Sequence, residues 1–256
     1  MHVRNDLMLS ERFLQNRCIT LTDAERGAID GAVSRVVRIS GRKTISQRGE
    51  HLSESTLLVE GFMCRYIDDR QGLRQLVAMH VPGDFVDLHG YPLTWLDHDV
   101  ATLTQATVAR VPHEALDEII EDQPQLARKL WFSTLMDAAA HRAWLFRLGR
   151  LDAMGRIAHF LCEMNARLQA VGLSDGHSFA LGITQYDLSE ACGLTSIHVN
   201  RVLKQLREEG LCTLRSQYCE IHDQPALAKR GQFRPDYLYL ALDETADGPS
   251  ETAATA

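Results

Sequence analysis

Three side chains in one short segment are of the types that read DNA bases. Within the residues from Ile183 to Leu211, which read ITQYDLSEACGLTSIHVNRVLKQLREEGL, Ile197 and Arg201 lie four residues apart and Asn200 lies beside them. In the major groove, arginine pairs with guanine, asparagine pairs with adenine, and an apolar side chain contacts the methyl group of thymine. These residue types indicate contacts with base pairs, provided that one helix presents them to the groove.

The same segment contains the signals for two short helices joined by a tight turn. Thr184 can cap the first helix with Asp187 at the reciprocal position, and Gly193 supplies the turn. Thr195 can cap the second helix, whose apolar positions follow the spacing i, i+3, i+4 and i+7. Those positions are Val199, Val202, Leu203 and Leu206. The pattern predicts a helix-turn-helix, which places the first residues of its second helix in the major groove.

A β-hairpin is predicted directly after the second helix. Alternating residues at 211–214 and 218–221 flank the turn residues Ser216 and Gln217. A helical hairpin with a merely solvated polar side is the alternative, but the β-hairpin occupies the place of the wing in a winged helix and favours DNA binding. The expected DNA-binding residues are Thr184, Gln185, Thr195, Ser196, Ile197, His198, Asn200, Arg201 and Lys204.

The N-terminal half has a different pattern. Between about Arg38 and Val111, short segments rich in β-branched and aromatic residues alternate with turn signals such as Pro82-Gly83-Asp84, which predicts an antiparallel barrel or roll. From Pro124 to about Leu148 the period becomes that of a long helix with two apolar stripes. One stripe holds Phe132, Leu135, Met136, Ala139, Ala143 and Phe146, and the other holds Leu126, Leu130, Trp144 and Leu148. Two stripes predict two contacts, one with the barrel and one with a second subunit, so we expect a homodimer; a helix buried within a monomer is the alternative.

The long helical pattern breaks at Gly149 to Asp152, where we place a hinge. A second amphipathic helix follows from Arg156 and stops at Gly172, and the final residues TADGPSETAATA are typical of a disordered tail. The predicted fold class is α+β. The predicted domains are a β-barrel sensor domain with an N-terminal helical segment (1–123), a dimerisation helix with hinge (124–151), a winged helix-turn-helix (152–242) and a disordered tail (243–256).

Composition narrows the class of protein. The 256 residues are 45% hydrophobic, and no run of about 18 apolar residues is free of charge, so we expect a globular protein without a membrane span. The N-terminus lacks a secretion signal, which favours the cytoplasm. The six cysteines include no CxxC pair, which argues against a zinc ribbon or a disulfide scaffold. The net charge of −7 disfavours nucleic-acid binding, but four acids of the C-terminal half lie in the tail.

Five motifs along the chain extend the interpretation of the C-terminal half. They are Leu73-Arg-Gln-Leu-Val, Val81-Pro-Gly-Asp-Phe, Arg156-Ile-Ala, Thr184-Gln-Tyr-Asp-Leu and Asn200-Arg201. With these motifs the chain resembles the Crp/Fnr family of bacterial transcription regulators from about Leu21 to Leu240. The resemblance implies a cyclic-nucleotide-binding-like barrel, a dimerisation helix and a winged helix. It also implies a homodimer on a pseudo-palindromic DNA site, RNA polymerase as a partner, and control by a small-molecule or redox signal in the barrel.

The sequence departs from the family members that bind cyclic nucleotides. Those members carry Gly-Glu-Leu after Pro-Gly-Asp and a later Arg-Ser or Arg-Thr pair, which supply the donors for the cyclic phosphate. Here the first turn reads Asp87-Leu88-His89, and Asp97 and Asp99 lie where the phosphate would bind. Because acids repel a phosphate, we expect that cyclic AMP and cyclic GMP are not the signal. A cyclic-nucleotide-responsive regulator is the alternative.

Other ligands of the family depend on cysteines and histidines. An iron–sulfur cluster needs a set of N-terminal cysteines, and Cys18 stands alone there. His80, His89 and His98 lie at nine-residue intervals, which suggests a haem or metal site. We expect these histidines to be turn or surface residues without a common target.

An enzyme is the alternative from a different class. A cupin-like metal-dependent barrel would need a His-x-His pair near a glutamate, and the predicted barrel contains no His-x-His. We therefore expect no catalytic residues, no metal and no cofactor.

Overall fold

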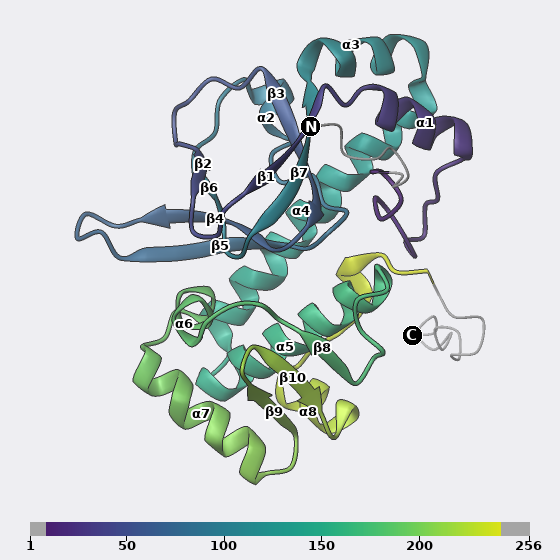
Figure 1. Ribbon diagram of the computed structural model, residues 1–256. Coiled ribbons are helices and arrows are strands. Elements are labelled where there is room, and N and C mark those ends of the chain that lie inside the picture. Colours follow the sequence, from purple (N-terminus) through teal and green to yellow (C-terminus); the bar gives the residue numbers. More distant parts are fainter. Residues whose placement is uncertain (1–8, 242–256) are drawn as a thin grey trace, which may run out of the picture.

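Two antiparallel β-sheets form the N-terminal half of the chain in the computed structural model, which describes residues 9–241 (Figure 1). One sheet has the strand order β1-β7-β3 and the other has β2-β6-β4-β5. The strands are β1 (Arg35–Ile39), β2 (Thr44–Ser46), β3 (Glu54–Glu60), β4 (Met63–Asp68), β5 (Arg74–His80), β6 (Asp99–Thr102) and β7 (Ala106–Pro112). The sheets share a small core that includes Leu58, Met63, Val100 and Val108, all of them buried.

The α+β class is confirmed, and of the predicted barrel or roll the structure shows the roll, so the β-barrel named for residues 1–123 is not closed. No ladder of hydrogen bonds joins the two sheets within residues 9–241. Irregular registers between β2 and β6, β3 and β7, and β4 and β5 bend the strands. The bent sheets therefore pack as an open roll, and the outer strand β5 is covered by a helix of the C-terminal half in place of another strand.

Four helices belong to this half and to its connection with the rest of the chain. They are α1 (Asp23–Gly31), α2 (Gly90–Leu93), α3 (His113–Asp122) and α4 (Pro124–Arg150). Helix α3 has no counterpart in the prediction. Helix α4 ends at Arg150 and not near Leu148, so Gly149 is helical and the break is confined to Leu151 and Asp152. Among the described residues, no helix is both long and apolar enough to cross a lipid bilayer.

The C-terminal half is a winged helix. Its elements are α5 (Ala153–Ala170), β8 (Ser178–Ala180), α6 (Gln185–Cys192), α7 (Ser196–Glu208), β9 (Cys212–Arg215), β10 (Tyr218–Ile221), α8 (Gln224–Arg230) and the 3₁₀ helix η1 (Pro235–Leu238). A third sheet has the order β8-β10-β9. Ser216 and Gln217 turn the predicted hairpin with φ of 48° and 65°, as a tight two-residue turn requires. Strand β8, which follows the predicted stop at Gly172, has no counterpart in the prediction, and the predicted tail at 243–256 lies outside the described residues.

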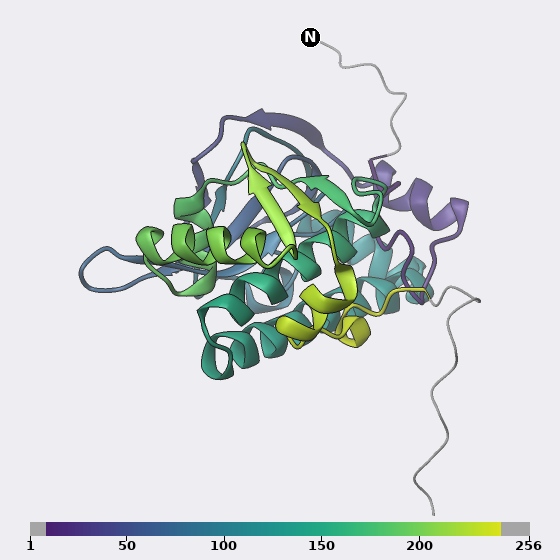
Figure 2. The same cartoon turned by 90° about the horizontal axis from the view of Figure 1, so that it is seen from below.

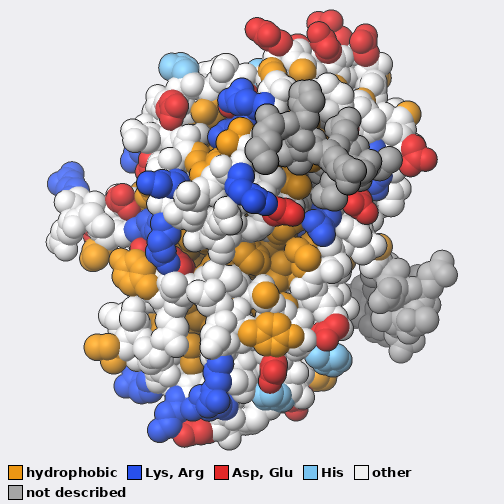
Figure 3. All heavy atoms as spheres, in the orientation of Figure 1, with side chains coloured by type: hydrophobic (Ala, Val, Ile, Leu, Met, Phe, Trp, Pro, Cys, Tyr) orange, Lys and Arg blue, Asp and Glu red, His pale blue; other side chains and the backbone are white. Residues whose placement is uncertain are grey.

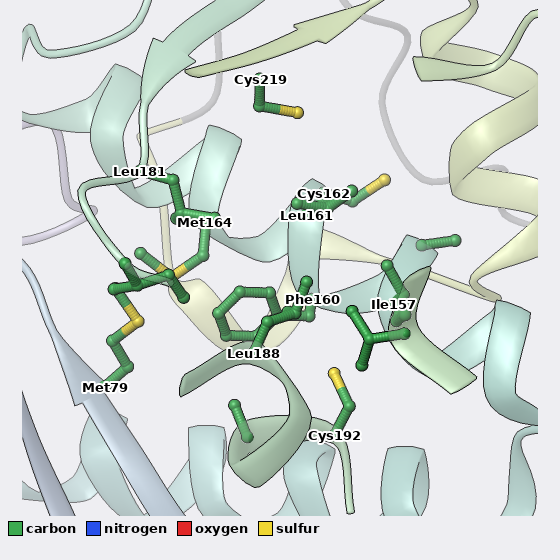
Figure 4. Packing of buried hydrophobic residues seen from close by; sticks show 14 of the residues in the cluster. Met79, Ile157, Phe160, Leu161, Cys162, Met164, Leu181, Leu188, Cys192 and Cys219 are labelled. Atoms are coloured by element: carbon green, nitrogen blue, oxygen red, sulfur yellow. The ribbon is translucent and has the colours of Figure 1, made fainter. Parts of the chain in front are cut away.

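The largest apolar core joins the two halves of the chain. Figure 4 shows Met79 of β5 in one apolar cluster with Phe160, Leu181 and Leu188 of the winged helix. All four side chains are buried to 0 or 1% exposure. The winged helix therefore packs directly against the β-sheet of the N-terminal half.

The three histidines at nine-residue intervals were predicted to be turn or surface residues, which is right only for His89, half-buried in a turn. His80 and His98 are buried, and the rings of His89 and His98 lie 5.2 Å apart between centroids. Burial and the nearby charge of Arg65 lower the pKa of His80 to about 4 and that of His89 to about 3. Arg65 is paired with Asp137 of α4. The histidines thus surround a buried ion pair as neutral rings, and no group of metal-ligating side chains occurs in the described part of the chain.

Candidate nucleic-acid interface

The first helix of the predicted helix-turn-helix begins at Thr184. The amide of Asp187 donates to the Thr184 hydroxyl at 3.2 Å, and the amide of Thr184 donates to the Asp187 carboxylate at 2.8 Å. These two bonds form the predicted capping box. Gly193 ends the helix with φ of 60°, a left-handed conformation that glycine adopts without strain.

The second helix, α7, presents opposite sides to the protein and to solvent. The helix is capped by Thr195, whose hydroxyl accepts a hydrogen bond from the backbone amide of His198 at 3.3 Å. The apolar positions are buried as predicted, and they are Val199, Val202, Leu203 and Leu206. Ile197 is 84% exposed on the other side, although an isolated apolar side chain gains nothing from contact with water. Ile197 is thus the apolar residue that α7 presents to solvent, opposite its packed side.

The predicted DNA-binding residues occupy two places in the structure. Asn200, Arg201 and Lys204 are exposed on α7 near Ile197, and the other α7 residues, Ser196 and His198, are half-buried in its first turn. Thr195 is exposed at the cap of α7, whereas Thr184 and Gln185 lie at the start of α6. The structure therefore brings the α7 residues together and leaves the α6 pair beside them.

Two polar side chains of α7 make contacts within the helix. The amide nitrogen of Asn200 donates to the carbonyl of Ser196 at 3.1 Å, so Asn200 must release this bond before it can pair with adenine. The ammonium of Lys204 lies 3.6 Å from the Glu208 carboxylate, and both side chains are more than half exposed. Such a surface pair is weak, so Lys204 can turn to a phosphate at little cost.

The structure adds basic residues that the prediction missed. Arg207 of α7 and Arg215 of the wing border one groove together with Tyr218. Lys and Arg side chains gather at this end of the molecule in Figure 3, and Figure 2 shows α7 and the wing on the same face. The position of Arg215 directly before the predicted wing turn was the signal that could have identified it.

A second groove runs beside α7, at the start of α5. Arg230 of α8 donates to both carboxylate oxygens of Asp152, at 2.9 and 2.7 Å. Asp152 also accepts from the amide of Gly155 at 2.8 Å and so caps α5. These hydrogen bonds, that of Arg230 foremost, lower the pKa of Asp152. His198 and Arg201 line the same groove, so the solvent side of α7 lies beside the start of α5.

Comparison with known proteins agrees with this geometry. Residues 155–230 match the model of the Crp-like helix-turn-helix domain. The chain is 24% identical over 206 residues to an anaerobic regulatory protein of Haemophilus influenzae, covering 80% of this chain and 79% of that protein. It is 23% identical over 210 residues to the fumarate and nitrate reduction regulatory protein of Escherichia coli, with coverage of 82% and 84%.

Solved structures share the architecture. FixK2 from Bradyrhizobium japonicum superposes with a TM-score of 0.70 at 26% identity, over 76% of this chain and 96% of that one. The regulator CLP of Xanthomonas campestris, described as responsive to c-di-GMP, superposes with a TM-score of 0.63 at 17% identity, over 79% of this chain and all of CLP. The chain thus carries a Crp-like helix-turn-helix domain and is homologous to the transcription regulators of the Crp/Fnr family.

Proposed function

We propose that this DNA-binding regulator acts as a homodimer that reads a pseudo-palindromic site with two copies of α7. The observation that carries the proposal is the solvent side of α7, where Ile197 is 84% exposed beside Arg201 on a helix whose other side is fully packed. In a helix-turn-helix this side enters the major groove. The groove between Arg207 and Arg215 adds positive charge for the phosphates at the wing.

The chemistry of three α7 side chains suggests which base each one contacts. Arg201 pairs with guanine, Ile197 packs on a thymine methyl group, and Asn200 pairs with adenine. Gln185 contacts a phosphate from the start of α6, whereas the hydroxyl of Thr184, also expected to bind DNA, is engaged by Asp187 and Arg42 and only caps the helix. The two half-sites lie about one helical turn, roughly 34 Å, apart because the two copies of α7 are related by the dimer axis.

The dimer forms along the exposed side of α4. Trp131, Leu135 and Leu145 are 65%, 51% and 75% exposed, although all three are large apolar residues. With the exposed Ala138 and Arg142 between them, they are spaced four, three, four and three residues apart, which is the period of a coiled-coil seam. A second copy of α4 would cover this stripe.

The exposed stripe differs from the two stripes predicted from the sequence. Ala139 and Met136, expected to face one partner together with Leu135, pack inward, and Phe132 lies 5.6 Å from the ring of Tyr239. Leu135 and Phe146 remain exposed. The side of α4 that faces solvent is therefore rotated from the predicted one.

A signal would act through a cleft between the roll and α4. The cleft has a cavity volume of about 80 Å³ and is lined by Arg65, His80 and Asp137 among others. The ring nitrogen Nε2 of His80 is buried without a hydrogen-bond partner there. A small molecule bound at this place would contact α4 directly and change its packing. The proposal further includes RNA polymerase as a binding partner of this regulator and the cytoplasm as its location.

Selection from a randomised duplex library tests the proposal. Wild-type protein and the variant Arg201→Ala are compared at a low and a moderate salt concentration. We expect wild type to enrich a pseudo-palindrome, and Arg201→Ala to weaken binding to that site by about 1–3 kcal/mol with little effect on random DNA. Equal losses on both DNAs would make Arg201 a phosphate contact, and no enrichment by wild type would contradict sequence-specific binding by this form.

A further inference from the structure

Two arginines of the sensor domain hold α6, the first helix of the helix-turn-helix. Arg74 of β5 donates twice to one carboxylate oxygen of Glu190, at 2.9 and 2.6 Å. Arg42, in the turn between β1 and β2, donates to the Asp187 carboxylate at 2.9 Å and to the Thr184 hydroxyl at 3.2 Å. Both arginines come from one half of the chain and all of their partners come from the other.

These ion pairs are shielded from water on the side of the winged helix. The side chains of Asp187 and Glu190 are 1% and 6% exposed, and that of Arg74 is 21% exposed. Removal of one partner would leave a buried carboxylate without its counter-charge, which costs far more than breaking a surface pair. Arg42 adopts φ of 62°, a left-handed conformation that is unusual for a residue with a side chain. Residues in such strained backbone conformations often have a functional role, and Arg42 is one whose side chain contacts the other half of the chain.

Close packing continues beside the ion pairs. A Cβ atom added to Gly182, at the start of the helix-turn-helix, would lie 3.0 Å from the Phe62 ring and 3.0 Å from the methyl group of Thr104. Gln75, next to Arg74, donates to the backbone carbonyl of Glu190 at 2.6 Å. Charged, backbone and apolar contacts thus fix one orientation of α6 on the sensor sheet.

We propose that Arg42 and Arg74 are positioning residues for DNA binding, which hold each winged helix at the angle to α4 that lets both copies of α7 meet their half-sites together. The contacts occupy α6 and leave the solvent side of α7 free, as the 84% exposure of Ile197 shows. A signal that shifts β5 or the β1–β2 turn would move α6 directly. This inference rests on the proposed dimeric DNA-binding function.

Two duplexes separate positioning from base reading. One carries the full selected pseudo-palindrome, and the other keeps one half-site and has random sequence in the second. We expect Arg74→Glu to weaken binding to the full site by roughly 5- to 150-fold, the usual range of coupling between sites. Binding to the single half-site is expected to stay at the wild-type level, because α7 itself is unchanged and only simultaneous engagement is lost.

A charge swap and a matched control complete the DNA experiment. The double variant Arg74→Glu with Glu190→Arg restores the ion pair in the opposite sense and is expected to recover most of the affinity for the full site. Arg70→Glu makes the same charge change in the exposed tip of the same hairpin and is expected to bind both duplexes as wild type does. Equal losses on both duplexes, an unchanged affinity for the full site, or tighter binding by Arg74→Glu would each overturn the proposal.

A measurement without DNA keeps this proposal separate from the proposed function. Spin labels at Arg38→Cys and Glu209→Cys, in a Cys18→Ser background, report the distance between the sensor domain and the end of α7. Labelled protein is mixed with excess unlabelled protein so that only distances within one protomer are read. We expect one narrow distance distribution, which broadens in Arg74→Glu and narrows again in the swapped pair. If Arg74→Glu leaves the distance distribution unchanged, the positioning role of Arg74 is contradicted even if DNA selection succeeds. A broadened distribution supports that role even if DNA selection fails.

Discussion

The indole nitrogen of Trp144 donates to both carboxylate oxygens of Glu163, at 3.0 and 3.1 Å, and joins the long helix α4 to the first helix of the winged-helix domain. Glu163 is fully buried and also accepts from the hydroxyl of Tyr237 at 2.7 Å. Burial alone would raise the pKa of Glu163, but the charges of Arg167 and Arg147 outweigh burial and hold its pKa below the ordinary value. A buried anion thus fixes the position of α5 on α4.

Replacement of Trp144 by phenylalanine keeps a ring in the core and removes the donor. We expect Trp144→Phe to lower the free energy of unfolding by about 1–3 kcal/mol, the cost of leaving a buried acceptor with one partner fewer. Urea unfolding at one fixed protein concentration measures the change. Trp95→Phe is the matched control, because Trp95 is 49% exposed, and it should alter stability little. Equal effects of the two substitutions would show that the bond to Glu163 contributes nothing specific.

The dimer surface on α4 is tested at its most exposed apolar residue. Leu145 is 75% exposed, and burial of a leucine contributes about 1.5–3 kcal/mol, which counts twice in a symmetric dimer. We expect Leu145→Lys to weaken dimerisation at least about a hundredfold, as measured by sedimentation equilibrium over a range of concentrations. Leu73→Lys, at a hairpin residue 62% exposed, should leave the dimer intact. If Leu145→Lys dimerises as tightly as the wild-type protein, this side of α4 is not the interface.

The helix-turn-helix was predictable because its signals are local. Thr184, Asp187, Gly193 and Thr195 set the ends of two short helices through bonds that span only a few residues. Strand β8 carries no such signal, since its three residues are a strand only because β10 lies beside them. Long-range pairing of this kind is invisible to local patterns.

The fold of the N-terminal half was less predictable for the same reason. Strand periodicity identified sheets but not whether they close, which depends on bends at irregular registers and on α6 covering β5. Spacing alone could not show that His80 and His98 are buried, because burial depends on which distant segments of the chain pack around them. Periodicity found two apolar sides on α4 but could not distinguish the side packed on its own domain from the side left for a partner.

The histidine cluster predicts a stability that falls in mild acid. In the unfolded chain a histidine binds a proton below about pH 6.5, whereas burial lowers the pKa of His80 to about 4 in the folded protein. Between these values the unfolded state binds more protons, so the free energy of unfolding falls as pH falls through this window. We expect the free energy of unfolding to fall by about 2 kcal/mol less in His80→Gln than in wild type when the pH is lowered from 7 to 4.5.

Urea unfolding of His80→Gln and wild type at several pH values measures this difference. His177→Gln, at an exposed histidine, serves as the control and should follow the wild-type curve. Because His89 has its pKa lowered in the same direction, part of the acid sensitivity should persist in His80→Gln. Parallel curves for His80→Gln and wild type would show that His80 does not carry the effect.

Ile197 offers the sharpest test of base reading, since it is the one large apolar side chain on the solvent side of α7 near Arg201. A carboxylate at this position accepts a hydrogen bond from the amino group of cytosine, whereas the isoleucine packs on the methyl group of thymine. We expect Ile197→Glu to change the preferred base pair at one position of each half-site from T·A to C·G, with a discrimination of about 1–3 kcal/mol. The guanine read by Arg201 should stay unchanged in the same selection. Gln205→Glu adds the same charge at an exposed position further along α7 and should weaken binding to all sequences alike. If Ile197→Glu selects the wild-type site, residue 197 does not contact a base, and the orientation of α7 in the groove must differ from the one proposed.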